Sequence, residues 1–172
     1  MGKAVVIALL LSCLAGGVGI WYAQTRAFWE RVDGPVTLSL DGVPIGATGV
    51  DAIRSASSPL GFRACFTHAA SFDPPARLDP APTVAPGWFD CFDADAIAAL
   101  VADGRAIAAT GVKNVAFGVD RVVALAEDGR GWAWHELNAC GRKSYDGTVT
   151  GEECPDRATY EPLVEGTLDA RP

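Results

Sequence analysis

Four cysteines after the N-terminal apolar run are the residues whose chemistry the sequence predicts most directly. Cys65, Cys91, Cys140 and Cys154 form an even set in a small domain, which is typical of disulfides formed outside the cytoplasm. No two cysteines have Cys-x-x-Cys spacing, so the sequence holds neither a thioredoxin-type motif nor a c-type haem attachment site. Of the three possible pairings, we expect Cys65–Cys91 and Cys140–Cys154, because this choice closes two local loops.

The histidines do not indicate a catalytic or metal site. His68 and His135 are the only two, and Met1 is the only methionine. Zinc sites draw three or four closely spaced ligands, and copper sites rely on Met and His, so neither metal is expected. No Gly-x-Ser-x-Gly motif accompanies His135, for which we expect a structural or interface role. The sequence therefore predicts no catalytic residue, cofactor or metal ligand, and it leans against an enzyme. A hydrolase of unrecognised type stays open, since sequence does not reveal convergent titratable groups.

Two aromatic residues, Trp88 and Phe89, are the candidates for binding a partner protein. They follow residues 73–86, where five prolines exclude a helix interior or central strand and predict a long, stiff surface loop. Exposed aromatics on such a loop suit protein contacts. Burial beneath the loop is the competing interpretation, and it is favoured by how often tryptophan is mostly buried. Trp132 and Trp134 share one strand face, for which we expect core packing against a helix.

The element that must position this domain is an apolar run over residues 4–23. Its length fits a hydrocarbon core of about 30 Å, with Trp21 and Tyr22 at its far end in the headgroup layer. We interpret it as an uncleaved signal anchor. A cleaved signal peptide, a lipoprotein site at Cys13 and an N-myristoylation signal are alternatives that fit the local residues less well.

The sequence after the anchor predicts one principal helix among short strands. Residues 93–102 have Asp93 as a plausible N-cap and three apolar residues on one face, and Gly104 ends the helix. Residues 36–40 alternate in polarity as a strand does, and residues 60–66 form a second strand. The clearest hairpin covers residues 121–137.

These elements indicate an α+β fold: an N-terminal transmembrane helix followed by a small antiparallel-sheet domain with one principal helix and two disulfides. We divide the chain into an anchor (residues 1–23), a juxtamembrane linker (24–33), the α+β domain (34–160) and a flexible C-terminal tail (161–172).

The domain is acidic, with 11 Lys and Arg against 20 Asp and Glu from residue 33 onward, a formal charge of −9. The charges are scattered, whereas nucleic-acid binding needs clustered Lys and Arg. We therefore expect no nucleic-acid partner.

Three segments resemble a family of uncharacterised alphaproteobacterial proteins with a single membrane anchor and a domain of unknown function. They are SPLGFRACF (residues 58–66), APGWFDCFD (85–93), and the hairpin end through Trp134 to NACG (138–141). The resemblance implies no activity and no functional residue. Some members carry a histidine-kinase label, which this sequence does not support, because it is too short for a nucleotide-binding domain and its histidines lie outside predicted helices.

Together these features predict a protein of the inner membrane, anchored through residues 4–23 with its amino terminus inside and its domain in the periplasm. The function favoured is a non-catalytic accessory or assembly component of an inner-membrane complex, with a membrane protein as partner. The alternative is a periplasmic module that binds or senses a small ligand. A deep polar pocket lined by His135 and carboxylates would favour the alternative, and an exposed apolar patch would favour the first function.

Overall fold

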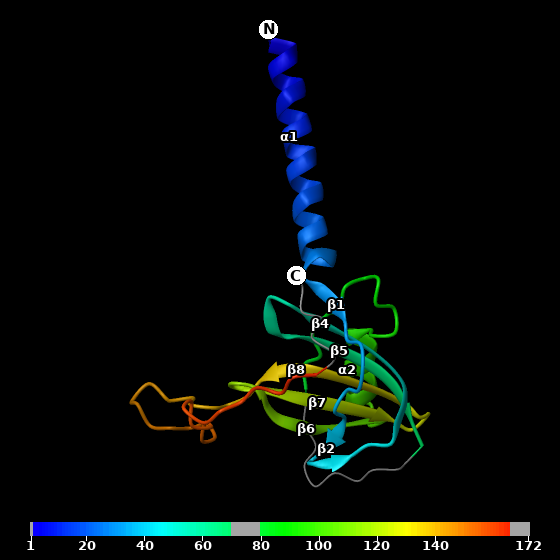
Figure 1. Cartoon of the computed structure of the whole chain (residues 1–172), viewed down its shortest axis with the longest axis vertical. Helices are drawn as coiled ribbons and strands as arrows, with labels where there is room; N and C mark the ends of the chain where they lie inside the picture. Colours follow the sequence, from blue (N-terminus) through cyan, green and yellow to red (C-terminus); the bar gives the residue numbers. More distant parts are fainter. Residues whose placement is uncertain (1, 70–79, 166–172) are drawn as a thin grey trace.

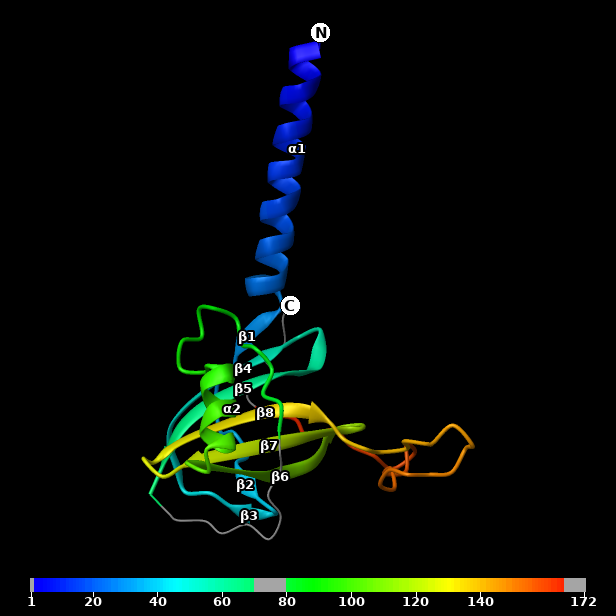
Figure 2. The same cartoon turned by 180° about the vertical axis from the view of Figure 1, so that it is seen from behind.

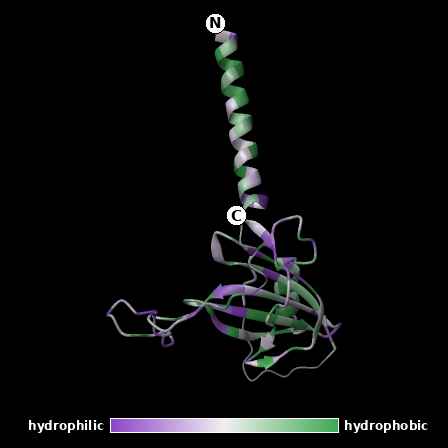
Figure 3. Cartoon of the chain, in the orientation of Figure 1, coloured by the Kyte–Doolittle hydropathy of each residue, from purple (hydrophilic) through white to green (hydrophobic). Residues whose placement is uncertain are grey.

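The computed structural model describes residues 2–69 and 80–165. It begins with helix α1 (Gly2–Tyr22), which continues into a short π-helical turn, η1 (Ala23–Ala27). The helix stands clear of the remaining chain (Figure 1), and apolar colours run along most of its length (Figure 3). None of α1 is buried, and Gly2–Ala27 is long and apolar enough to cross a membrane. A single residue, Phe28, separates η1 from the sheet domain.

The domain is built on a six-stranded antiparallel sheet with the order β1-β4-β5-β8-β7-β6. In chain order the strands are β1 (Trp29–Arg31), β4 (Ala47–Ser55), β5 (Ser58–His68), β6 (Ala106–Ala116), β7 (Val119–Ala126) and β8 (Arg130–Leu137). A separate small hairpin pairs β2 (Ser39–Leu40) with β3 (Val43–Pro44), and helix α2 (Ala94–Ala102) is the one helix within the described part of the domain.

Each face of the sheet has its own hydrophobic core, because neighbouring residues of a strand point to opposite faces. All of β7 is buried: Val122 and Ala124 belong to one core, and Val123 and Leu125 belong to the other. The first core is covered by α2, and Figure 2 shows that helix lying across the sheet. The second is covered by residues of the β2–β3 region: Leu38, Leu40 and Ile45.

The α+β prediction is confirmed, and the local signals that support it are present. Asp93 caps α2 by accepting a hydrogen bond from the Ala96 amide at 3.1 Å. Gly104 follows the helix with a φ of +72°, a left-handed conformation that glycine adopts without strain. Trp132 and Trp134 lie in the core that contacts Ile97 of α2, as their shared face predicted.

The two disulfides are Cys65–Cys91 and Cys140–Cys154, the pairs expected from the closing of local loops. The first joins β5 to the turn before α2, so it ties the helix layer to the sheet. The second closes a loop that follows β8 and lies outside the sheet.

Two segments differ from their sequence-based description. The strand expected over residues 36–40 forms only at Ser39–Leu40, because Thr37 uses its carbonyl and amide in contacts with the side chains of Arg121 and Glu165. Residues 24–33 were expected to be a linker, whereas most of them extend the helix as η1 or pair with β4 as strand β1. Much of the proline-rich stretch, up to residue 79, lies outside the described residues, and residues 80–86 are irregular.

Candidate functional site

Trp88 lies where η1, at the end of the N-terminal apolar helix, meets the domain. Its indole nitrogen donates a hydrogen bond of 2.6 Å to the carbonyl oxygen of Thr25 in η1. The guanidinium groups of Arg26 and Arg31 lie over the indole ring, at 5.5 and 5.9 Å from its centroid. Cation–π contacts of this kind contribute about 0.5–1 kcal/mol each at exposed sites. The side chain is half-buried and its one donor is in use, so Trp88 connects the domain to the end of the anchor.

Phe89 does not have the exposure that a partner-binding residue needs. Its side chain is 3% exposed and packs in the core beneath α2. Of the two interpretations of this pair, exposure for partner binding and burial, Phe89 follows the second. The turn before α2 directs its ring into the core, whereas the neighbouring Trp88 points toward η1.

A shallow open cavity of about 220 Å³ lies beside this turn. It is lined by residues between Val84 and Asp95, among them three aspartates, Asp90, Asp93 and Asp95. Ligand pockets usually measure about 300–1,000 Å³ and are mostly enclosed. His135 does not line this cavity, so it is not the pocket that would favour a small-ligand module.

The irregular segment before that cavity is held by a buried guanidinium. Arg63 is 4% exposed and donates a hydrogen bond of 2.8 Å to the carbonyl of Thr83 and another to its hydroxyl. Burial lowers the pKa of Arg63 to about 10, an effect that the charge of Glu136 partly offsets. Arg63 remains charged at neutral pH and fixes the described end of the loop against β5.

A second buried guanidinium, that of Arg121, is 1% exposed and lies on the face opposite α2. Its two terminal nitrogens bind the two carboxylate oxygens of Glu165, each at 2.7 Å. One of them also donates to the carbonyl of Thr37 at 2.7 Å. The bidentate pair is the geometry in which a guanidinium binds a carboxylate most strongly. Glu165 lies 44 residues further along the chain, so this pair ties the C-terminal segment to the middle of the sheet.

His135 completes the surroundings of Arg121. Arg121 Nε donates to His135 Nε2 at 3.2 Å, and His135 Nδ1 donates to the carbonyl of Pro59 at 2.6 Å. The imidazole is stacked on Phe62 at 4.6 Å between centroids, and the guanidinium lies 4.0 Å from the centroid of the same ring. Burial first, and then the charge of Arg121, lower the pKa of His135 to about 3, so the ring is neutral at physiological pH. A neutral, fully hydrogen-bonded imidazole fits the structural role expected for His135.

The described part of the expected tail, residues 161–165, lies along the sheet. The Leu163 amide donates to the carbonyl of Val115 at 2.9 Å. Arg54 donates to the main-chain carbonyl of Glu165 at 2.9 Å, and the Thr37 amide donates to its carboxylate at 2.5 Å. Together with Arg121, the groups of Val115, Arg54 and Thr37 hold this segment from four different parts of the chain. Residues 166–172 lie outside the described residues.

A long loop after β8 projects away from the sheet, and we call residues 139–155 the arm. In Figures 1 and 2 the arm, in orange, extends sideways relative to the line of α1. Its tip is a turn in which Ser144 accepts from Gly147 and donates to Thr148, with Gly147 at a φ of +86°. Tyr145 stands at this tip with its side chain fully exposed, at 109% of the reference area, and Val149 is 60% exposed.

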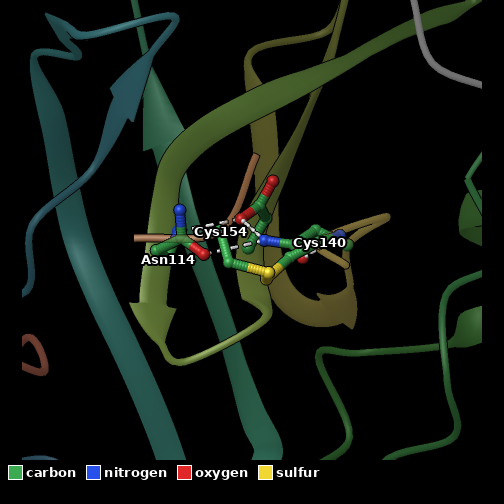
Figure 4. Close-up of a disulfide and its surroundings, with 5 residues drawn as sticks. Asn114, Cys140 and Cys154 are labelled. Carbon is green, nitrogen blue, oxygen red and sulfur yellow. Dashed lines mark hydrogen bonds between the residues drawn. A yellow bond between two sulfur atoms is a disulfide. The ribbon is translucent and has the colours of Figure 1, made fainter. Parts of the chain in front are cut away.

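The base of the arm is fixed by a disulfide and a network of side chains. Figure 4 shows the Cys140–Cys154 disulfide beside Asn114. The Asn138 amide nitrogen donates to Asn114 at 2.9 Å and to Asp120 at 2.7 Å, while its oxygen accepts from the amide of Cys140. Asn114 has a φ of +52°, held by a bond from its own amide to Asp120. The arm is therefore attached to β6, β7 and β8 by a rigid base.

Sequence reasoning did not identify Arg121, Glu165 or the arm as features of interest. Arg121 directly precedes the apolar residues 122–126 of β7, and it points to the same face of the strand as Val123 and Leu125. This alternation indicates from the sequence that the charge of Arg121 is buried. Glu165 lies in a segment without periodicity, so no signal pointed to it. Among residues 2–69 and 80–165, no group of three or more His, Cys, Asp and Glu side chains is arranged to hold a metal ion.

Comparison with known proteins gives one match. The model of a family of unknown function, DUF6446, matches residues 36–155. The matched region contains Arg121, His135 and the arm, and it leaves out the anchor and Glu165. No curated protein and no solved structure matches the chain.

Proposed function

The chain belongs to this family of unknown function, and from its geometry we propose that it is a membrane-tethered accessory protein whose arm contacts a neighbouring membrane protein. The arm carries the proposal: it has a rigid base and displays a fully exposed tyrosine at its tip. Tyrosine is enriched among the residues that dominate protein–protein binding energies. A loop fixed before binding loses little conformational entropy when it docks.

The connection to the anchor supports a docking role near the membrane. Phe28 alone separates η1 from β1, and Trp88 holds the end of η1 by hydrogen bonding to Thr25. A flexible linker would let the domain rotate freely, whereas this junction limits its orientation relative to α1. With α1 across a bilayer, the arm would extend sideways over the membrane surface, where it meets other membrane proteins. We propose that Trp88 sets this orientation.

We place the domain in the periplasm, with α1 in the inner membrane. The two disulfides support an oxidising compartment, because thiols stay reduced in the cytoplasm of most organisms. The exposed tyrosine on an arm with a fixed base makes association the function that the geometry supports best. The small-ligand alternative has less support, since the cavity beside α2 is open and only about 220 Å³.

The proposal is tested by placing a photo-crosslinking phenylalanine analogue at position 145 in the full chain in intact membranes. Position 43 is the control, because Val43 is also an exposed residue, at 60%, but lies on the β2–β3 hairpin. We expect a discrete adduct of higher mass from position 145 and none from position 43. An absence of adducts from position 145, or identical adducts from both positions, would contradict a docking role for the arm.

The arm's contribution to affinity is tested separately with Tyr145→Ala. Since the side chain makes no buried contact, the melting temperature should be unchanged. Recovery of the crosslinked partner by affinity purification from gently solubilised membranes should fall about tenfold or more, as for loss of a central aromatic contact. Equal recovery with a stable variant would show that the contact lies elsewhere.

A further inference from the structure

The strap, which we define as residues 163–165, occupies a site that is built to bind a carboxylate. The site consists of the Arg121 guanidinium, the backbone N–H of Thr37 and the Arg54 guanidinium. The first two bind the Glu165 carboxylate, and Arg54 binds the main-chain carbonyl of the same residue. Recognition of a side chain and its own backbone carbonyl is recognition of an extended peptide.

Besides its carboxylate, the strap contributes one partly covered apolar residue. Leu163 is 37% exposed and Val164 is 63% exposed, so the apolar area that the strap buries lies mainly in Leu163. One further backbone hydrogen bond joins the Leu163 amide to the carbonyl of Val115 in β6, at 2.9 Å. The strongest contacts are therefore those of the carboxylate, a group that any acidic peptide segment can supply.

Arg121 makes an empty site unfavourable. Its side chain is 2% exposed, and the Glu165 side chain is 9% exposed. Withdrawing the carboxylate would leave a buried guanidinium unpaired, which is strongly destabilising. Exchange of one carboxylate for another keeps the ion pair and its hydrogen bonds, so it avoids that cost. Exchange of the Glu165 carboxylate for another carboxylate is therefore more favourable than its departure, which leaves the site empty.

We propose that this carboxylate site binds an acidic peptide segment in trans, which replaces the strap. The ligand class is an extended segment with a Glu or Asp that presents its side-chain carboxylate to Arg121. Its source is either the tail of a second copy of this chain or an acidic segment of another protein. The intramolecular strap has an effective concentration in the millimolar range, so a competitor must be held nearby, as proteins tethered to one membrane are.

A peptide-binding measurement tests the site itself. The probe is the pentapeptide of residues 161–165, EPLVE, amidated at its carboxyl end and labelled at its amino end, against the detergent-solubilised full chain. Glu165→Ala should bind it about tenfold or more tighter than the unaltered chain, because its own carboxylate no longer competes. The same peptide with Gln at its last position should lose about tenfold or more in affinity for Glu165→Ala.

The matched control variant carries Arg121→Met and Glu165→Met together. Replacing both members of a buried ion pair by apolar residues is often neutral for stability, so this variant should stay folded. It should not bind the peptide. Binding of EPLVE to this double variant as tight as to Glu165→Ala, or no binding by folded Glu165→Ala, would overturn the proposal. If Glu165→Ala fails to fold, Glu165→Gln takes its place, since it keeps the side-chain volume while removing the charge.

The source of the segment is distinguished by photo-crosslinking at position 37. Thr37 is exposed at its side chain while its amide contacts the bound carboxylate. In membranes that hold the unaltered chain together with Glu165→Ala, the latter carrying the crosslinker, an adduct of twice the monomer mass would identify a second copy as the source. An adduct of another mass that disappears in the Arg121→Met/Glu165→Met variant would identify an acidic segment of a different protein. Crosslinks confined to the same chain would contradict exchange in membranes.

Discussion

Burial and two neighbouring guanidinium groups keep His135 neutral. Burial, followed by the charges of Arg121 and Arg63, lowers its pKa to about 3, although the bond to the Pro59 carbonyl opposes this shift. An unfolded histidine has a pKa near 6.5. The unfolded chain therefore binds more protons than the folded chain between these values, so the free energy of unfolding should fall as pH falls through this window.

We expect urea midpoints to decrease between pH 7 and pH 4.5, with a contribution from His135 on the order of 2–3 kcal/mol over that range. His135→Gln supplies the control, since an amide can accept from Arg121 and donate to Pro59 without titrating. The midpoint of that variant should vary less with pH. An identical pH dependence in the two proteins would show that His135 takes up a proton as readily in the folded state as in the unfolded state.

Neighbouring positions 88 and 89 should respond to substitution in different ways. Phe89→Ala removes a side chain that is 3% exposed, so it should lower the free energy of unfolding by about 3–5 kcal/mol. Trp88→Phe keeps a ring but loses the bond to the Thr25 carbonyl. We expect a nearly unchanged unfolding free energy and faster tryptic cleavage after Arg26 in solubilised protein. Equal cleavage rates would mean that Trp88 does not hold the junction.

At the scale of elements, segments with a clear period or cap could be predicted, and those governed by distant contacts could not. Helix α2 follows its N-cap and apolar face, and the β7–β8 hairpin follows its apolar runs and turn glycine. Strand β2 is shorter than its alternation predicts, because Thr37 binds Arg121 and Glu165. The base of the arm is fixed by hydrogen bonds among Asn114, Asp120 and Asn138. Asn138 is distant in the sequence from the other two residues, so no local sequence pattern predicts these contacts.

The two disulfides should stabilise different elements. Cys140→Ser with Cys154→Ser releases a loop outside the sheet, so the melting temperature should change little while tryptic cleavage after Arg142 and Lys143 becomes faster. Cys65→Ser with Cys91→Ser frees the α2 layer from β5 and should lower the free energy of unfolding by about 2–5 kcal/mol. Calorimetry and timed proteolysis on both variants separate the effects. A large loss of global stability from the arm variant would show that the arm is part of the folding core.

For the molecule as a whole, the arrangement of charges about α1 bears on its orientation in a membrane. Lys3 lies in the first turn of α1, and Arg26 and Arg31 follow the helix, so a count of positive charges does not decide which end is inside. The structure adds that Arg26 and Arg31 lie over the Trp88 ring, so both are engaged by the folded domain. We therefore give more weight to the disulfides, which form and persist outside a reducing cytoplasm.

This reasoning predicts that an enzyme active only in the periplasm, fused after Pro172 of the full chain, will be active, and that a fluorescent reporter that matures only in the cytoplasm will be dark. Non-reducing electrophoresis of the same membranes should show all four domain cysteines blocked to alkylation, with Cys13 the remaining free thiol. A charge-reversed anchor, Lys3→Glu with Arg26 and Arg31 retained, tests the physical premise. This variant places more positive charge after the helix than before it. If the domain is stable only when it is oxidised, the variant should give less oxidised protein, and no stable cytoplasmic form should accumulate.

A bright cytoplasmic reporter with reactive domain cysteines would contradict the topology. It would also contradict the compartment in which the arm is proposed to act.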